Sequence, residues 1–198
     1  MVVDVIIPVY RPEREKLTKL IDWLNKQTVK PSHVFFMQTL VEKKEDAEVL
    51  QMLQKAENAK VVPIEKKDFD HGGTRNKGAA LSKADYMLFM TQDAVPVDAY
   101  LIENLVQAME KEEAATAYGR QLPDDTVGVI EHYTREFNYP AKSYVKSKKD
   151  LETMGIKTYF CSNVCAMYRK DVYEKMGGFV LHLSLIHISE PTRPISIS

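Results

Sequence analysis

Residues 2–9 read Val-Val-Asp-Val-Ile-Ile-Pro-Val, a short β-branched run typical of a buried parallel strand. Pro12, three residues after the run, suits the first turn of a helix. That helix is predicted from a single apolar stripe at helical spacing, made of Leu17, Leu20, Ile21 and Leu24. The start of the chain therefore predicts one strand followed by one amphipathic helix.

The same strand–helix unit recurs along the chain. Further strands are predicted over residues 33–38, 60–64 and 86–91. Helical stripes are formed by Val49, Met52, Leu53 and Ala56 and by Ile102, Leu105, Val106 and Met109, the second with Asp98 as its expected cap. Between them, a Gly-Gly-Thr turn at residues 72–74 is expected to open a helix through Ala79, Ala80 and Leu81. Because right-handed crossovers place helices on both faces, we expect one three-layer α/β/α domain with a mostly parallel, Rossmann-like sheet.

The pattern loosens after a short strand expected at residues 114–118. Residues 119–157 are predicted as loops and short helices over the carboxyl edge of the sheet. Residues 158–168 are predicted as a returning strand, and a short helix after it should end at Gly177-Gly178. The strand-like segment holds both cysteines, Cys161 and Cys165, which we interpret as buried, reduced thiols.

Composition narrows the class of protein. With 44% hydrophobic and 28% charged residues, the 198-residue chain is ordinary for a globular domain. Its net charge of −1 gives no field that would favour nucleic acid as a partner. Lys146, Lys148 and Lys149 form the only local basic run, interpreted as a solvated loop. Neither a signal peptide nor an apolar stretch of about 18 residues is present, so we expect a cytoplasmic chain without a transmembrane segment.

The last residues differ from everything before them. Residues 183–193 read Leu-Ser-Leu-Ile-His-Ile-Ser-Glu-Pro-Thr-Arg, which resembles the translation of a sequencing adapter. We therefore expect residues 180–198 to be a non-native tail and residues 1–179 to be an incomplete domain, truncated at its C-terminal end.

In open α/β sheets, ligands bind at the carboxyl ends of the strands. The polar or turn-forming residues at the ends of the predicted strands are therefore the candidate site. They comprise Pro8, Val9 and Tyr10 after strand one, His71, Gly72, Arg75 and Asn76 after strand three, and Gln92 and Asp93 after strand four.

The loop after strand three is the most informative of these segments. Gly72 and Gly73 let the backbone approach a ligand, and the following helix start offers unpaired N–H groups to an anion. Arg75 offers a planar fork for a phosphate or a base carbonyl. The alternative is a tight loop in which Arg75 only binds surface carbonyls.

Asp93 is the candidate metal ligand. A carboxylate and a ligand diphosphate commonly hold Mg²⁺ or Mn²⁺ together, with waters filling the other positions. A helix cap is the alternative role for Asp93, although Asp98 fits that role better. His71 is either a metal or phosphate contact or a hydrogen-bonded loop residue. Tyr10 either lies over a base or packs on the first helix.

Taken together, these segments resemble the family 2 glycosyltransferases of the GT-A fold, especially bacterial rhamnosyltransferase-like members. The resemblance covers residues 3–179. The matching segments are residues 5–10 (Val-Ile-Ile-Pro-Val-Tyr), 69–76 (Phe-Asp-His-Gly-Gly-Thr-Arg-Asn), 89–96, 118–123, 136–140, 160–169 and 177–179.

The resemblance implies a role for each matching residue. Pro8, Val9 and Tyr10 would line the base and ribose of the nucleotide, Arg75 would contact the nucleotide, and Asn76 would support that loop. Asp93 would be the metal-binding acid of an Asp-x-Asp-like motif, and Ser162 and Asn163 would lie where the acceptor side meets the donor sugar. The chain departs from the family pattern at two positions where the family carries an acid. Gln38-Thr39 stand at the end of strand two, and Thr91 before Gln92 replaces the first acid of the Asp-x-Asp-like motif. The identity of the nucleotide is therefore open.

The implied activity is inverting transfer of a sugar, with rhamnose from dTDP-rhamnose favoured and a UDP-sugar as the other donor. The acceptor would be a cell-surface saccharide or a lipid-linked one, with the full-length protein peripheral at the inner face of the membrane. The family's catalytic base follows Gly-Gly-Phe, so we expect it after Phe179, absent from this chain, and we expect the chain to be inactive. The alternatives are a binding-only module for a nucleotide or partner, or a nucleotidyltransferase.

Overall fold

The computed structural model describes residues 1–122 and 137–181, and these contain a six-stranded sheet in the order β3-β2-β1-β4-β6-β5. The strands are β1 (Val3–Val9), β2 (His33–Thr39), β3 (Ala59–Ile64), β4 (Tyr86–Met90), β5 (Thr116–Tyr118) and β6 (Cys165–Arg169). β1 pairs in parallel with β2 and β4, and β2 with β3, whereas β6 pairs antiparallel with both β4 and β5. The strand order reverses between β1 and β4, which is the position where open sheets of this kind bind ligands.

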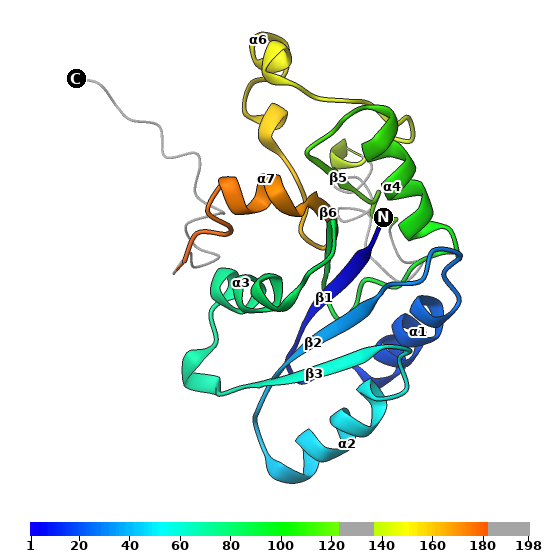
Figure 1. Ribbon diagram of the computed structural model, residues 1–198, viewed down its shortest axis with the longest axis vertical. Coiled ribbons are helices and arrows are strands. Elements are labelled where there is room, and N and C mark those ends of the chain that lie inside the picture. Colours follow the sequence, from blue (N-terminus) through cyan, green and yellow to red (C-terminus); the bar gives the residue numbers. More distant parts are fainter. Residues whose placement is uncertain (123–136, 182–198) are drawn as a thin grey trace, which may run out of the picture.

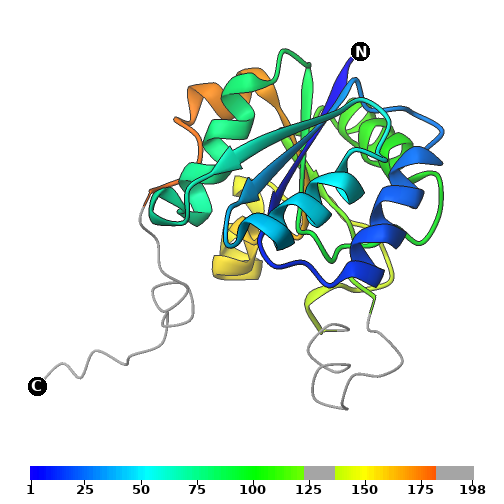
Figure 2. The same cartoon turned by 90° about the horizontal axis from the view of Figure 1, so that it is seen from below.

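Helices cover both faces of the sheet, which confirms the predicted three-layer architecture (Figures 1 and 2). On one face lie α1 (Arg14–Asn25), α2 (Lys43–Leu53) and α4 (Leu101–Lys111), and on the other α3 (His71–Leu81) and α7 (Lys170–Lys175). We call these the α1 face and the α3 face. A 3₁₀ turn, η1 (Lys66–Asp68), leads from β3 into α3.

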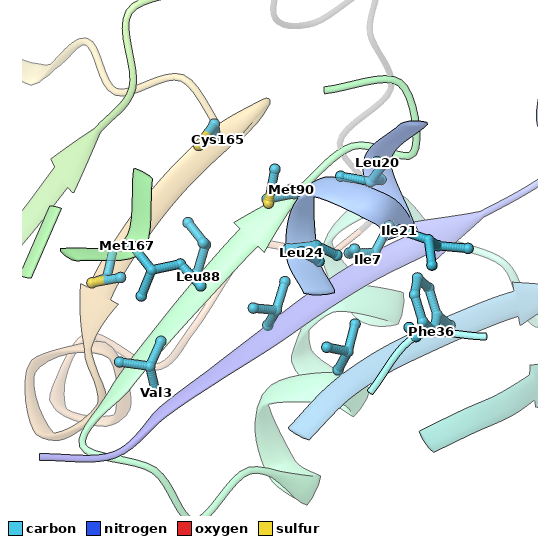
Figure 3. Close-up of a cluster of buried hydrophobic side chains, with 14 of the residues drawn as sticks. Val3, Ile7, Leu20, Ile21, Leu24, Phe36, Leu88, Met90, Cys165 and Met167 are labelled. Atoms are coloured by element: carbon cyan, nitrogen blue, oxygen red, sulfur yellow. The ribbon is translucent and has the colours of Figure 1, made fainter. Parts of the chain in front are cut away.

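The α1 face is a mostly aliphatic core that also contains Phe36 and Tyr86. The four residues of the first predicted stripe are all buried, and Figure 3 shows three of them, Leu20, Ile21 and Leu24, over the strands. The stripe of α4 is likewise fully buried. Side chains of β1, β2, β4 and β6 meet these helices in one continuous cluster.

The α3 face is packed differently. α3 buries Thr74, Gly78 and Ala79 rather than large side chains, while Leu81 at its end is exposed. A Cβ at Gly78 would lie 2.5 Å from Cγ2 of Ile6, so only glycine lets α3 approach β1 this closely. Behind it, Phe89 contacts the rings of Tyr168, Tyr173 and Phe179.

Two expectations about where helices start were wrong. Asp98 does not cap α4, because its carboxylate accepts the N–H of Tyr100, and the N–H of Ile102 donates to Oε1 of Gln27. Pro12 precedes the helix, since α1 begins at Arg14.

The strand expected over residues 158–168 is only Cys165–Arg169. Residues before it form the 3₁₀ helix η3 (Gly155–Tyr159), and the carbonyl of Ser162 accepts the N–H of Cys165 in a turn. Of the two cysteines, both free, Cys165 is buried as expected, whereas Cys161 is half-buried.

Short helical elements, as expected for this stretch, are η2 (Lys148–Asp150), α6 (Leu151–Met154) and η3, with α6 at the opposite end of the molecule from α2 (Figure 1). Gly177 and Gly178 follow α7 with φ of 79° and 75°, which confirms the predicted helix stop. The expected non-native tail falls, except for residues 180 and 181, outside the described residues. None of the helices in the described ranges has the length and apolar character that crossing a membrane requires.

Candidate functional site

The ends of β1 and β4 are tied together at the reversal of strand order. The side-chain amide of Gln92 accepts the N–H of Tyr10 at 2.8 Å and donates to the carbonyl of Tyr10 at 3.0 Å. These two bonds link the residue after β1 to the loop that follows β4. Tyr10 is thereby held with its ring exposed at the carboxyl edge.

Residues from the middle of the chain and from before β6 also meet at this edge. The N–H of Thr91 donates to the carbonyl of Val164 at 3.0 Å, which brings the Gln92–Asp93 segment beside Ser162 and Asn163. Asn163 accepts the hydroxyl of Tyr168 at 2.7 Å. Oγ of Ser162 accepts the amide of Gln121 at 2.8 Å. The structure therefore gathers the predicted donor-side and sugar-side segments at one edge.

The N-terminus of α3 lies on the same side. Its cap is Asp70, whose carboxylate accepts the N–H of Gly73. Gly72 and Gly73 lie inside the first helical turn, whereas the sequence predicted a turn that precedes the helix. The N–H groups of the first turn thus point out of the helix end, as anion binding requires.

An aromatic series links the helix end to β1. The ring of Phe69 stacks on Tyr10 with centroids 6.4 Å apart, and His71 meets Phe69 edge-on at 5.1 Å. The ring of Tyr10, expected to lie either over a base or on the first helix, contacts Phe69. Phe69 was missed as a site residue, although it opens the segment of residues 69–76.

Arg75 is a half-buried cation with spare hydrogen-bonding capacity. One terminal nitrogen donates to the carbonyl of His71 at 2.9 Å, whereas the buried Nε has no partner among the described residues. Burial lowers the pKa of Arg75, with the nearby hydroxyls of Tyr168 and Tyr173 acting the other way. Guanidinium stays protonated in proteins, so the site keeps a positive charge. The alternative in which Arg75 only binds surface carbonyls therefore accounts for one of its nitrogens.

Asn76 connects α3 to the turn after α7. Its amide donates to the carbonyl of Phe179 at 2.8 Å, and its oxygen accepts the N–H of Phe179 at 2.9 Å and the hydroxyl of Tyr173. Burial raises the pKa of Tyr173 to about 12, so this hydroxyl stays a donor at neutral pH. Asn76 thus supports the Gly-Gly-Phe turn and the loop of residues 69–76 together.

The remaining predicted residues differ in what they can offer a ligand. The side chain of Val9 is buried in the α1-face core, so only its backbone can face a ligand, while Pro8 is half-buried. Gln38, at the end of strand two, is buried and donates to the carbonyl of Asp46. Pro8, Val9 and Gln38 therefore contribute to the shape of the site and not to its polar contacts.

Asp93 has an exposed carboxylate at the edge. In the part of the chain that the structure describes, no three His, Cys, Asp or Glu side chains converge as metal ligands. A cation here would take one carboxylate from the protein and its other oxygens from a diphosphate and water, which suits Mg²⁺ or Mn²⁺.

Comparisons with known proteins show the family of the chain. Residues 4–177 match the family described as glycosyl transferase family 2. The chain is 37% identical over 186 residues to the O-antigen chain rhamnosyltransferase RfbN of Salmonella typhimurium, covering 93% of this chain and 58% of the relative. It is 31% identical over 181 residues to the O-antigen chain rhamnosyltransferase WbaN of Salmonella anatum, covering 91% and 56%. The chain therefore spans little more than half the length of these relatives.

Solved structures share the fold at low identity. TarS of S. aureus, residues 1–349 in complex with UDP-GlcNAc, superposes with a TM-score of 0.65 at 19% identity, over 92% of this chain and 50% of that one. The mannosyltransferase PcManGT of Pyrobaculum calidifontis, in complex with GDP-Man and Mn²⁺, gives 0.56 at 16% identity, over 90% and 47%. The fold is thus of the GT-A type. Because the family match covers residues 4–177, the chain belongs to glycosyl transferase family 2.

Proposed function

We propose that this chain binds a nucleoside diphosphate sugar and serves in an inverting transfer of that sugar to a saccharide or lipid-linked acceptor. One observation carries the proposal. At the reversal of strand order, Gln92, next to the exposed Asp93, bonds to Tyr10, and Tyr10 stacks on Phe69, which leads into the N-terminus of α3 with Arg75. A planar group, a helix end with a cation, and a carboxylate match the base, the diphosphate and the metal of such a ligand.

The diphosphate is expected at the first turn of α3. The N–H groups of this turn other than that of Gly73, which Asp70 caps, and the positive end of the helix dipole favour an anion there. The guanidinium of Arg75, which bonds to the carbonyl of His71 in this turn, is the cation that would complete the contact. These groups would stabilise negative charge on the departing nucleoside diphosphate.

Asp93 is proposed as the protein's ligand to Mg²⁺ or Mn²⁺. When bound, such a cation neutralises charge that builds on the diphosphate oxygens. Gln92 holds the end of β4 against Tyr10 and so positions the neighbouring Asp93 relative to the base-binding side. Ser162 and Asn163 follow across the edge, on the sugar side.

The donor proposed first is dTDP-rhamnose, because the curated relatives at 37% and 31% identity are named rhamnosyltransferases. A UDP-sugar is the second choice. The catalytic base is proposed to follow Phe179, whose backbone Asn76 holds against α3 near the diphosphate position. The inactivity of the chain as given, the cytoplasmic location and contact with the inner face of the membrane stay predictions.

Thermal unfolding tests the nucleotide and metal site. dTDP should raise the melting temperature of the chain with Mn²⁺ or Mg²⁺ present, and much less in EDTA, because the cation bridges diphosphate and Asp93. Asp93→Asn should remove the effect of the metal, whereas Asp98→Asn, an exposed acid on the same segment, should not. Equal stabilisation of the wild type in EDTA would contradict the metal site.

Donor choice is tested by the same measurement. With Mn²⁺ present, dTDP-rhamnose should stabilise the chain at lower concentration than UDP-glucose, and the reverse order would overturn the sugar proposal. Sugar transfer by a longer form of the protein, with its native sequence after Phe179, would support the proposed transferase activity. Nucleotide binding by that form without transfer would favour a binding-only module.

A further inference from the structure

An aromatic cluster lies beyond the sugar-side residues, at the carboxyl edge next to β5. Tyr118, Tyr139 and Phe160 contact one another edge-to-face, with ring centroids 5.9–6.3 Å apart. Tyr118 ends β5, and Phe160 lies between η3 and β6. β5 runs in the same direction as β4, since both pair antiparallel with β6, so Tyr118 lies at the same edge of the sheet as Asp93.

Lys146 holds this cluster together. Its ammonium donates to the carbonyls of Lys157 and Phe160, lies 3.4 Å from the hydroxyl of Tyr118, and sits over the rings of Tyr118 and Phe160. Burial lowers the pKa of Lys146. Its three donors are therefore directed at protein oxygens, unlike a lysine in a solvated loop, so it fixes ring positions rather than offering a free charge.

The cluster has a buried floor and an open rim. Tyr139 is 8% exposed, whereas Phe160 is 39% and Tyr144 47% exposed. Tyr144 lies near the same ammonium, 6.0 Å from its ring centroid. Rigid rings with a hydroxyl at hand provide large contact area at low entropic cost, and they suit a neutral ligand that has both apolar faces and hydroxyl groups. A saccharide is such a ligand.

The cluster is continuous with the sugar side of the site. The side-chain amide of Gln121 donates to the hydroxyl of Tyr139 at 2.6 Å and to Oγ of Ser162 at 2.8 Å. Ser162 in turn precedes Val164, whose carbonyl binds Thr91 beside Asp93. A ligand on the rim would thus lie next to the position expected for the donor sugar.

We propose that Tyr144 and Phe160 form a stacking subsite for the acceptor saccharide, with Lys146 and Gln121 as positioning residues. The proposal rests on the proposed function, since it takes the neighbouring edge as the donor site. Stacking on aromatic rings is tolerant of sugar identity, so the subsite orients the acceptor, while hydrogen-bonding residues select it.

Calorimetric titration of the chain with O-antigen oligosaccharide released from lipopolysaccharide tests the subsite. Phe160→Leu and Tyr144→Leu keep apolar volume but remove the rings. Each should weaken oligosaccharide binding about three- to tenfold, the fold-change equivalent of an aromatic contact. Tyr100→Leu, which changes a 53% exposed tyrosine on another element, should leave binding unchanged.

A parallel melting experiment with dTDP and Mn²⁺ separates the two proposals. Both ring variants should keep the wild-type nucleotide response, because the nucleotide side does not contact these rings. Oligosaccharide binding that is absent in the wild type, or unchanged in both variants, would overturn the subsite while a normal nucleotide response leaves the donor site standing. Loss of the nucleotide response in the wild type would instead contradict the proposed function.

Discussion

The two faces of the sheet are held by different kinds of contact. On the α1 face, long aliphatic side chains such as Leu20 and Leu24 fill a continuous core. On the α3 face, Gly78 allows a close approach, and aromatic rings meet edge-on. There Asn76 makes two hydrogen bonds to Phe179 after α7 and one to Tyr173 within α7. The difference indicates that the α1 face mainly provides stability, whereas the α3 face sets the geometry of the candidate site.

The reason lies in what each contact specifies. Apolar packing is non-directional, so the α1 face tolerates exchange of similar side chains and mainly stabilises the sheet. Hydrogen bonds and glycine contacts are directional or tightly spaced, so the α3 face sets where the N-terminus of α3, Arg75 and Phe179 lie. The contacts of the α3 face therefore determine where the candidate site lies.

The largest effect is expected on the α1 face. Leu20→Ala should lower the free energy of unfolding by about 2–5 kcal/mol, because it leaves a cavity at a fully buried position. Urea denaturation measures this. Leu81→Ala, at an exposed leucine of α3, is the matched control and should cost far less. A small loss for Leu20→Ala would break the assignment of stability to this face.

A smaller and more local effect is expected on the α3 face. Asn76→Ala should cost about 1–3 kcal/mol, since it leaves buried partners unsatisfied. Hydrogen exchange should quicken at the amide of Phe179, while the amides of β1 and β2 keep their protection. Asn104→Ala, at an exposed asparagine of α4, should change neither quantity. Uniform loss of protection would mean that the two faces are not separable.

The smallest perturbation uses the two thiols as reporters. Cys165 belongs to the α1-face core, and burial raises its pKa to about 12, so it is protonated and inaccessible at pH 8. Cys161 is half-buried beside Tyr168. Ellman's reagent should therefore label one thiol in the native chain at pH 8 and the second only after unfolding. Cys161→Ser should abolish the early reaction, and simultaneous labelling of both thiols would refute the contrast.

Regular elements were predictable because their signals are local. The β-branched run of β1 and the four-residue stripe of α1 determine their own conformations, and α2, β2, β3, β4 and α4 follow within a few residues. The glycines after α7 predicted its end for the same reason. Cap identity failed at α4, because the N–H of Ile102 is taken by Gln27, which is distant in sequence.

The candidate site was predictable only as a set of strand ends. That polar residues after successive parallel strands converge follows from topology alone, and the segments around Tyr10, Arg75 and Asp93 do lie at one edge. Phe69, Gln121 and Tyr173 were not found in advance, since no spacing in the sequence marks a ring that stacks or an amide that bridges loops.

By itself, then, the sequence determined the strand–helix order, the three layers and the edge where a ligand would bind, because burial patterns and chain direction are encoded residue by residue. Only the tertiary structure decided that β6 runs antiparallel, that Lys146 is turned inward onto carbonyls and rings, and that Asn76 fastens Phe179 to α3. Each of these depends on contacts between residues far apart in the chain, whose geometry exists only once the core has formed.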